Sequence, residues 1–139
     1  MRREIPDEKR LVHEMHIPIR WGDMDAMGHV NNVSYFRYLE TARIEWLNGA
    51  GFAPTPDGEG FVIINAFCNF LIQLEYPGTV VARTYAANLG RSSFDSFTTM
   101  EREDQPGVIS AAGGATIVWV NFPLQKSTPF PERLRALIA

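Results

Sequence analysis

The 139-residue sequence contains one cysteine, three histidines and little net charge. With Cys68 as its only thiol, the chain forms no disulfide within itself. Its 13 basic and 16 acidic residues give a net charge of −3, which provides no general attraction for nucleic acid. Its longest apolar run, at residues 115–120, is far shorter than the ~20 residues of a membrane helix. We therefore expect a soluble protein that binds neither nucleic acid nor membrane.

The N-terminus lacks the apolar segment of a signal peptide, because Met-Arg-Arg leads directly into further charged residues. This pattern predicts a cytoplasmic protein. A chain of 139 residues, of which 45% are hydrophobic, is large enough for one core, so residues 1–139 are expected to form a single domain. Residues 1–12 are charged and without periodicity, which predicts a flexible N-terminal arm.

One long helix and several strands are predicted from the spacing of apolar residues. Apolar residues recur at helical spacing within residues 32–48, and Gly49 provides a C-terminal stop signal. This segment is therefore expected to be a helix at the centre of the core. Residues 129–139 are expected to add a short helix with Pro131 in its first turn. Strands are predicted at residues 13–21, 61–67, 80–85, 93–100 and 115–120.

Short connections determine the expected fold class. Turns at residues 76–79, 89–91 and 104–107 can join only antiparallel neighbours, whereas the Gly- and Pro-rich segment 51–60 is expected to be a loop. Pro18 places the first strand at an edge of the sheet, because proline cannot donate to a ladder. The sequence therefore predicts an α+β domain in which a mostly antiparallel sheet wraps one helix.

Polar residues are crowded into the stretch R-W-G-D-M-D-A-M-G-H-V-N-N-V-S-Y, residues 20–35, directly before the long helix. A helix needs at most one cap, and Asn31, Asn32 and Asp25 are all residue types that cap well. The loop therefore either serves only to start the helix or has a further, chemical purpose.

The segment Asp23–Tyr35, followed by Tyr38-Leu-Glu-Thr-Ala-Arg43, resembles the signature of the 4-hydroxybenzoyl-CoA thioesterase family of hotdog-fold proteins. It is most similar to the acyl-CoA thioesterase branch that carries a Gly-His-Val-Asn-Asn element. The resemblance implies a five- or six-stranded antiparallel sheet around the helix. It also implies an acyl-CoA substrate, no cofactor other than the coenzyme A of that substrate, and a homodimer or homotetramer with active sites at the dimer interface.

The resemblance also assigns catalytic residues. It places the catalytic carboxylate at Asp25, as nucleophile or general base, and an amide that polarises the thioester oxygen at Asn32. A helix N-terminus suits that second role, because its free N–H groups and positive partial charge stabilise an oxyanion. His29 either positions a water or the carboxylate, or only packs locally. Asp23 is expected to be structural.

Other residues are expected to bind the substrate or to compete for the catalytic role. Gly28, Asn31 and Tyr35 are expected to bind the substrate, with Tyr35 as a candidate to line the acyl pocket. Arg91, Ser92 and Ser93 are candidates to bind the phosphates of coenzyme A. Glu40, on the long helix, is an alternative catalytic carboxylate, although pairing with Arg37 or Arg43 is the simpler expectation.

Two other functions fit the same fold: a non-catalytic acyl-CoA binding module, and a hydratase or dehydratase that uses a histidine with a carboxylate. No metal site is predicted, because His13 and His16 are three residues apart on a strand and point to opposite faces. The nature of the acyl group, aliphatic or aromatic, stays open.

Overall fold

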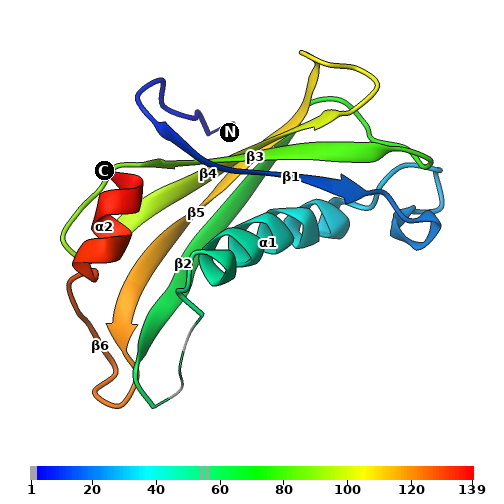
Figure 1. Cartoon of the computed structure of the whole chain (residues 1–139). Helices are drawn as coiled ribbons and strands as arrows, with labels where there is room; N and C mark the ends of the chain where they lie inside the picture. The colour runs from blue at the N-terminus through cyan, green and yellow to red at the C-terminus, as the bar shows by residue number, and fades with distance from the viewer. Residues whose placement is uncertain (1–2, 54, 56) are drawn as a thin grey trace.

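The computed structural model describes residues 3–53, 55 and 57–139. In it, one curved sheet wraps a single long helix, α1 (Asn32–Gly49), as Figure 1 shows. The strands are β1 (Arg10–Pro18), β2 (Glu59–Phe70), β3 (Thr79–Ala87), β4 (Ser93–Arg102), β5 (Ile109–Asn121) and β6 (Lys126–Ser127). A 3-10 turn, η1 (Trp21–Asp23), precedes α1, and a short helix, α2 (Glu132–Ile138), ends the chain. The predicted α+β architecture is confirmed.

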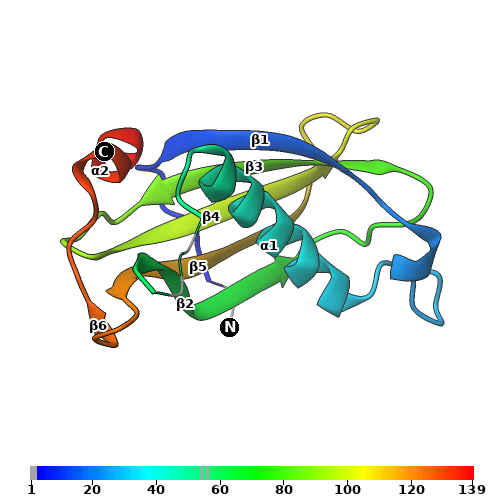
Figure 2. The ribbon, with the colours of Figure 1, turned by 60° about the horizontal axis from the view of Figure 1, so that its bottom comes forward.

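The strand order is β1-β3-β4-β5-β2, with β6 paired to β5, and every pairing is antiparallel. Strand β1 lies at one edge, as Pro18 predicted. Strand β2 forms the other edge and pairs with β5 alone among the described residues. Figure 2 shows α1 lying across one face of the sheet, so the opposite face belongs to the outside of the molecule.

The core divides along α1 into two clusters. The first surrounds the N-terminal half of the helix, where Tyr38 and Leu39 pack against residues of β1, β3 and β4. The second surrounds its C-terminal half, where Trp46 meets Phe94 of β4 and α2 closes the end with Leu134. Burial of the wide apolar face of α1 therefore requires almost the whole sheet and α2 as well.

Several predicted boundaries were wrong. Strand β1 begins at Arg10, so residues 10–12 belong to the sheet and not to a flexible arm, and β1 ends at Pro18 before η1. Strand β5 begins at Ile109, six residues before the predicted start at 115. The early start of β5 was not recognised because the strand contains a pair of glycines, Gly113 and Gly114, and glycine is more typical of turns. In the structure a Cβ on Gly113 would lie 2.8 Å from Leu39 Cδ1 and 2.6 Å from the Phe67 carbonyl oxygen.

Replacement of Gly113 by alanine should therefore destabilise the fold by about 1–3 kcal/mol, because the added methyl group overpacks the contact between β5 and α1. Gly49→Ala at the end of α1 is the matched control: a Cβ there has nothing within 4 Å, and its effect should stay below about 1 kcal/mol. Urea unfolding of both variants measures the difference. Equal stability of the two variants would contradict this account of the glycine pair.

Candidate active site

The segment between η1 and α1 folds back on itself. Met24 and Val30 form an antiparallel bridge, and between them the Asp25 N–H donates to the His29 carbonyl oxygen at 2.7 Å. The Gly28 N–H donates to the Asp25 carbonyl oxygen at 3.1 Å, and Gly28 adopts φ of +77°, a conformation that favours glycine. The polar stretch is thus a tight loop whose shape is set by its own backbone.

Asp25 lies at the centre of this loop with an exposed side chain. Its Oδ1 accepts hydrogen bonds from the backbone N–H groups of Met27 (2.9 Å) and His29 (3.2 Å). Its Oδ2 has no hydrogen-bond partner among the residues that the structure describes. The carboxylate borders a hollow of about 550 Å³ that Trp21 and Tyr76 also line. The loop therefore orients the carboxylate and leaves one of its oxygens free.

The start of α1 separates the roles of the two asparagines. Asn31 is the N-cap, and its side-chain oxygen accepts the Val33 N–H at 2.9 Å. Asn32 is the first helical residue, and within the described chain its backbone N–H has no hydrogen-bond partner. Asn31 thus starts the helix, while the Asn32 N–H is a free donor at the positive end of the helix dipole.

Asp23 is buried, with 6% of its surface exposed. Its Oδ2 accepts the Arg20 N–H at 2.9 Å and the Tyr38 hydroxyl at 2.7 Å, and its Oδ1 pairs with the Arg37 guanidinium. Burial acts to raise the pKa of Asp23, but the hydrogen bonds from Tyr38 and Arg20 and the charge of Arg37 together hold it below its ordinary value. These contacts agree with the structural role predicted for Asp23.

The other residues predicted near Asp25 lie differently. The His29 ring faces Glu75, with 3.5 Å between Nε2 and Oε1, and only the His29 backbone touches the Asp25 carboxylate. Tyr35 is buried in the core, where its hydroxyl accepts the Leu74 N–H at 3.1 Å, so it does not line the hollow beside Asp25. Glu40 is exposed and, in the part of the chain described, pairs with neither Arg37 nor Arg43.

Arg91, Ser92 and Ser93 are not near Asp25 in the same chain. They stand at the start of β4. The Asp25 loop instead follows the end of β1. Because β1 pairs antiparallel with β3, and β3 with β4, the end of β1 lies at the same end of the sheet as the end of β4. Ten residues of β4 separate these two ends of the sheet, about 30 Å at the usual rise of a strand. Figure 1 shows the two ends on opposite sides of the molecule.

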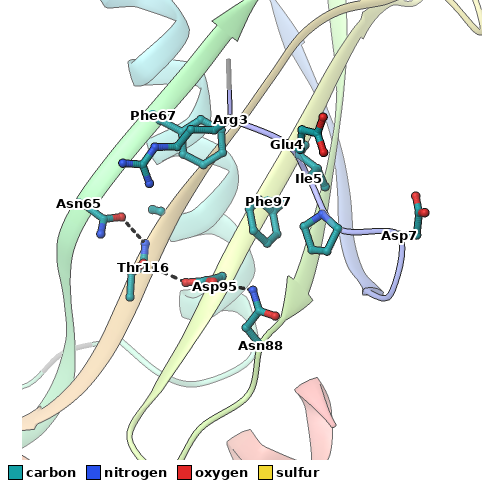
Figure 3. A pocket seen from close by; sticks show the side chains of 12 residues that line it. Arg3, Glu4, Ile5, Asp7, Asn65, Phe67, Asn88, Asp95, Phe97 and Thr116 are labelled. Carbon is teal, nitrogen blue, oxygen red and sulfur yellow. Dashed lines mark hydrogen bonds between the residues drawn. The ribbon is translucent and has the colours of Figure 1, made fainter. Parts of the chain in front are cut away.

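A second hollow, of about 510 Å³, lies on the outer face of the sheet beneath residues 3–7 (Figure 3). Both carboxylate oxygens of Asp95 in its wall already accept hydrogen bonds, one from the Thr116 hydroxyl (2.9 Å) and the other from the Asn88 side-chain amide (2.7 Å). The aromatic rings of Phe67 and Phe97 form another part of the wall. Asp95 thus offers this hollow no carboxylate oxygen without a hydrogen-bond partner among the described residues, whereas Asp25 presents one to the first hollow.

The histidines of β1 point apart: His13 pairs with Glu45 at 2.6 Å and His16 with Glu103 at 2.7 Å. Among the described residues, no three side chains of the metal-binding types come together. In the same part of the chain, neither helix has the length and apolarity needed to cross a membrane.

Sequence reasoning missed the aromatic walls of the Asp25 hollow. Trp21 directly precedes the Gly-Asp-Met-Asp element and is 77% exposed, which is unusual for tryptophan. Tyr76 comes from the turn between β2 and β3, and only the fold brings it beside Asp25. The position of Trp21 in the motif was the one available signal.

Comparisons with known proteins agree with this fold. A model of the thioesterase-like superfamily matches residues 19–138. The solved PA2801 protein of Pseudomonas aeruginosa, provisionally named a thioesterase, is 39% identical, with a TM-score of 0.86 over 91% of this chain and 98% of that one. The BH1999 gentisyl-coenzyme A thioesterase is 29% identical, with a TM-score of 0.78 over 91% of this chain and 100% of that one.

A Xanthomonas campestris protein, XC229, provisionally named an acyl-CoA thioesterase, is 31% identical, with a TM-score of 0.73 over 79% of this chain and 93% of its own. The architecture is that of the hotdog fold. The chain belongs to the thioesterase-like superfamily. The family, the fold and the enzyme class predicted from the sequence, a thioester hydrolase, are confirmed.

The low pKa of Asp23 predicts how its contribution to stability depends on pH. A carboxyl group whose pKa is lower in the folded state than its ordinary value of 3.8 stabilises the fold above that value and loses the contribution as pH falls through its folded pKa. Asp23→Asn should therefore be clearly less stable than the parent at pH 7, and the gap should narrow below about pH 4. Urea unfolding across this range measures it. A gap that stays constant down to pH 2.5 would contradict the assignment.

Proposed function

We propose that this protein hydrolyses an acyl-CoA to the free acid and coenzyme A, with Asp25 as the catalytic carboxylate and the Asn32 N–H as the oxyanion donor. The observation that carries the proposal is the loop itself, in which Asp25 has one oxygen held by two N–H groups and the other free. The names of the superfamily and of the similar solved proteins support a CoA thioester as substrate.

The chemistry requires an attack on the thioester carbonyl carbon and stabilisation of the resulting oxyanion. Asp25 either attacks that carbon directly, which gives an acyl–aspartyl anhydride that water then hydrolyses to the free acid, or removes a proton from a water that attacks the carbon itself. The carbon–sulfur bond then breaks, and the coenzyme A sulfur leaves as a thiolate that takes up a proton. A free N–H at the start of α1 stabilises the negative charge that develops on the carbonyl oxygen. The proposed reaction uses only residues of the protein, with coenzyme A entering as part of the substrate.

We further propose that the active unit is a homodimer, formed edge to edge through β2. The free edge of β2 is a surface that soluble proteins normally cover. Exposed apolar side chains lie beside it, with Phe70 at 48% exposure and Ile72 at 47% exposure near the end of β2. A twofold axis would pair β2 antiparallel with β2 of the partner subunit. The start of β2 in one subunit would then lie beside the end of β2 in the other. The Arg91 turn of one subunit would then come to the same end as Asp25 of its partner.

Asp25→Asn should reduce hydrolysis of the best CoA thioester by at least about 1000-fold, because the amide neither attacks nor accepts a proton. Thiol release from short-, medium- and long-chain acyl-CoAs and from 4-hydroxybenzoyl-CoA measures the loss and ranks the substrates. Asp95→Asn on the outer face is the matched control and should retain activity within about threefold.

Other outcomes would redirect the assignment. Activity that survives in Asp25→Asn would move the catalytic role to Glu40. An inactive parent that still binds coenzyme A would indicate an acyl-CoA binding module instead of an enzyme.

The dimer proposal makes a separate prediction about Arg91. Arg91→Ala should raise KM for acyl-CoA, because the arginine contacts the phosphates, whereas Asp25→Asn is inactive. In a mixture of the two variants, each heterodimer would hold one site that combines an intact Asp25 with an intact Arg91. Such mixtures, after subunit exchange, should show sites with the KM of the parent. Sites that keep only the raised KM would mean that Arg91 serves the Asp25 of its own chain or none.

A further inference from the structure

We infer that Asp23 is a positioning residue for catalysis, which sets the distance between the Asp25 carboxylate and the Asn32 N–H. This inference rests on the proposed function. Asp23 does not border the hollow beside Asp25, so its action must pass through the loop.

The contacts of Asp23 join three separate parts of the chain. Its carboxylate binds the segment that follows β1 through the Arg20 N–H. It also binds the second turn of α1 through Tyr38 and Arg37. Its carbonyl oxygen accepts the Asn31 N–H at 2.8 Å, at the point where α1 begins. One residue therefore binds both ends of the loop and the helix that follows it.

The two proposed catalytic groups lie directly beside these contacts. Asp25 is two residues after Asp23, and Asn32 is the residue after Asn31. The Met24–Val30 bridge and the Asp25 N–H bond to His29 make the loop between them stiff, so a shift of Asp23 would move the whole loop against the helix. A displacement of about 1 Å between reacting groups costs on the order of 100-fold in rate.

Glu101 provides a matched control on the other face of the sheet. It is 5% exposed, pairs with Arg83 and accepts the Gly107 N–H at 2.7 Å, so its environment is similar to that of Asp23. Its neighbour Met100 points into the core beneath α1, and alternation along β4 directs Glu101 to the outer face. Glu101→Gln should therefore weaken the fold without moving the Asp25 loop.

The experiment compares Asp23→Asn, Tyr38→Phe and Glu101→Gln with the parent, using steady-state thiol release and backbone amide exchange of the folded proteins. Asp23→Asn should lower kcat about 100-fold and leave KM within about threefold of the parent value. The residues that bind the substrate are unchanged in this variant, and only the relative position of the two catalytic groups differs. Tyr38→Phe removes a single hydrogen bond and should lower kcat about tenfold; it also serves if Asp23→Asn does not fold. Glu101→Gln should keep kcat within about twofold.

Amide exchange tests the same inference without any substrate. In Asp23→Asn and Tyr38→Phe the hydrogen-bonded amides of Met27, His29 and Asn31 should exchange faster relative to core amides, while in Glu101→Gln they should not. Unchanged kcat in Asp23→Asn and Tyr38→Phe, or an equal loss in Glu101→Gln, would overturn the inference. If the parent hydrolyses no thioester, the proposed function fails and the catalytic part of the inference fails with it. Amide exchange still separates the two failures: unchanged exchange at these three amides would show that Asp23 does not hold the loop either.

Discussion

One long helix has to be buried by one sheet, and most features of the molecule follow from this constraint. An apolar face as wide as that of α1 needs a sheet that curves around it, and the close approach of β5 is possible only because Gly113 has no side chain. Helix α2 closes the end of the core that the sheet leaves open. The polar loop lies at the start of α1, where Asn32 and Val33 are exposed.

The position of the loop connects packing with chemistry. A helix N-terminus at the surface has free N–H groups and a positive partial charge. These N–H groups bond to water unless a capping side chain or a ligand accepts their hydrogen bonds. Here Asn31 accepts one of these N–H groups, the Asn32 N–H stays free among the described residues, and the loop before them orients the Asp25 carboxylate. Because Asp23 is tied to both the helix and the loop, the stability of the helix start and the geometry of the site depend on the same buried carboxylate.

Much of this could be predicted from the sequence, for physical reasons that differ between elements. The helix, the antiparallel strands and the edge position of β1 came from periodicity, short turns and Pro18, which are local signals. The first half of β5 was missed because Gly113 and Gly114 are not typical strand residues, and only their packing against Leu39 and Phe67 explains them. The capping role of Asn31 and the sharp turn at Gly28 were also predictable, since both follow from the residue type.

The remainder depends on contacts between distant residues. Tyr76 reaches the Asp25 hollow, and Arg37 pairs with Asp23 instead of Glu40, only through the folded arrangement. Tyr35 was expected beside the acyl group, and it lies in the core because its helix face points to the sheet. The separation of Arg91 from Asp25 along β4 likewise follows from the pairing register, which no local pattern in the sequence specifies.

The most direct test of the account is an NMR titration with an acyl-CoA analogue in which a methylene group replaces the thioester sulfur, so that it binds but is not cleaved. The largest amide shifts should fall on residues 25–32, with the Asn32 N–H moving downfield as it donates to the carbonyl oxygen. Shifts concentrated around Asn88 and Thr116 on the outer face, with residues 25–32 unmoved, would contradict it.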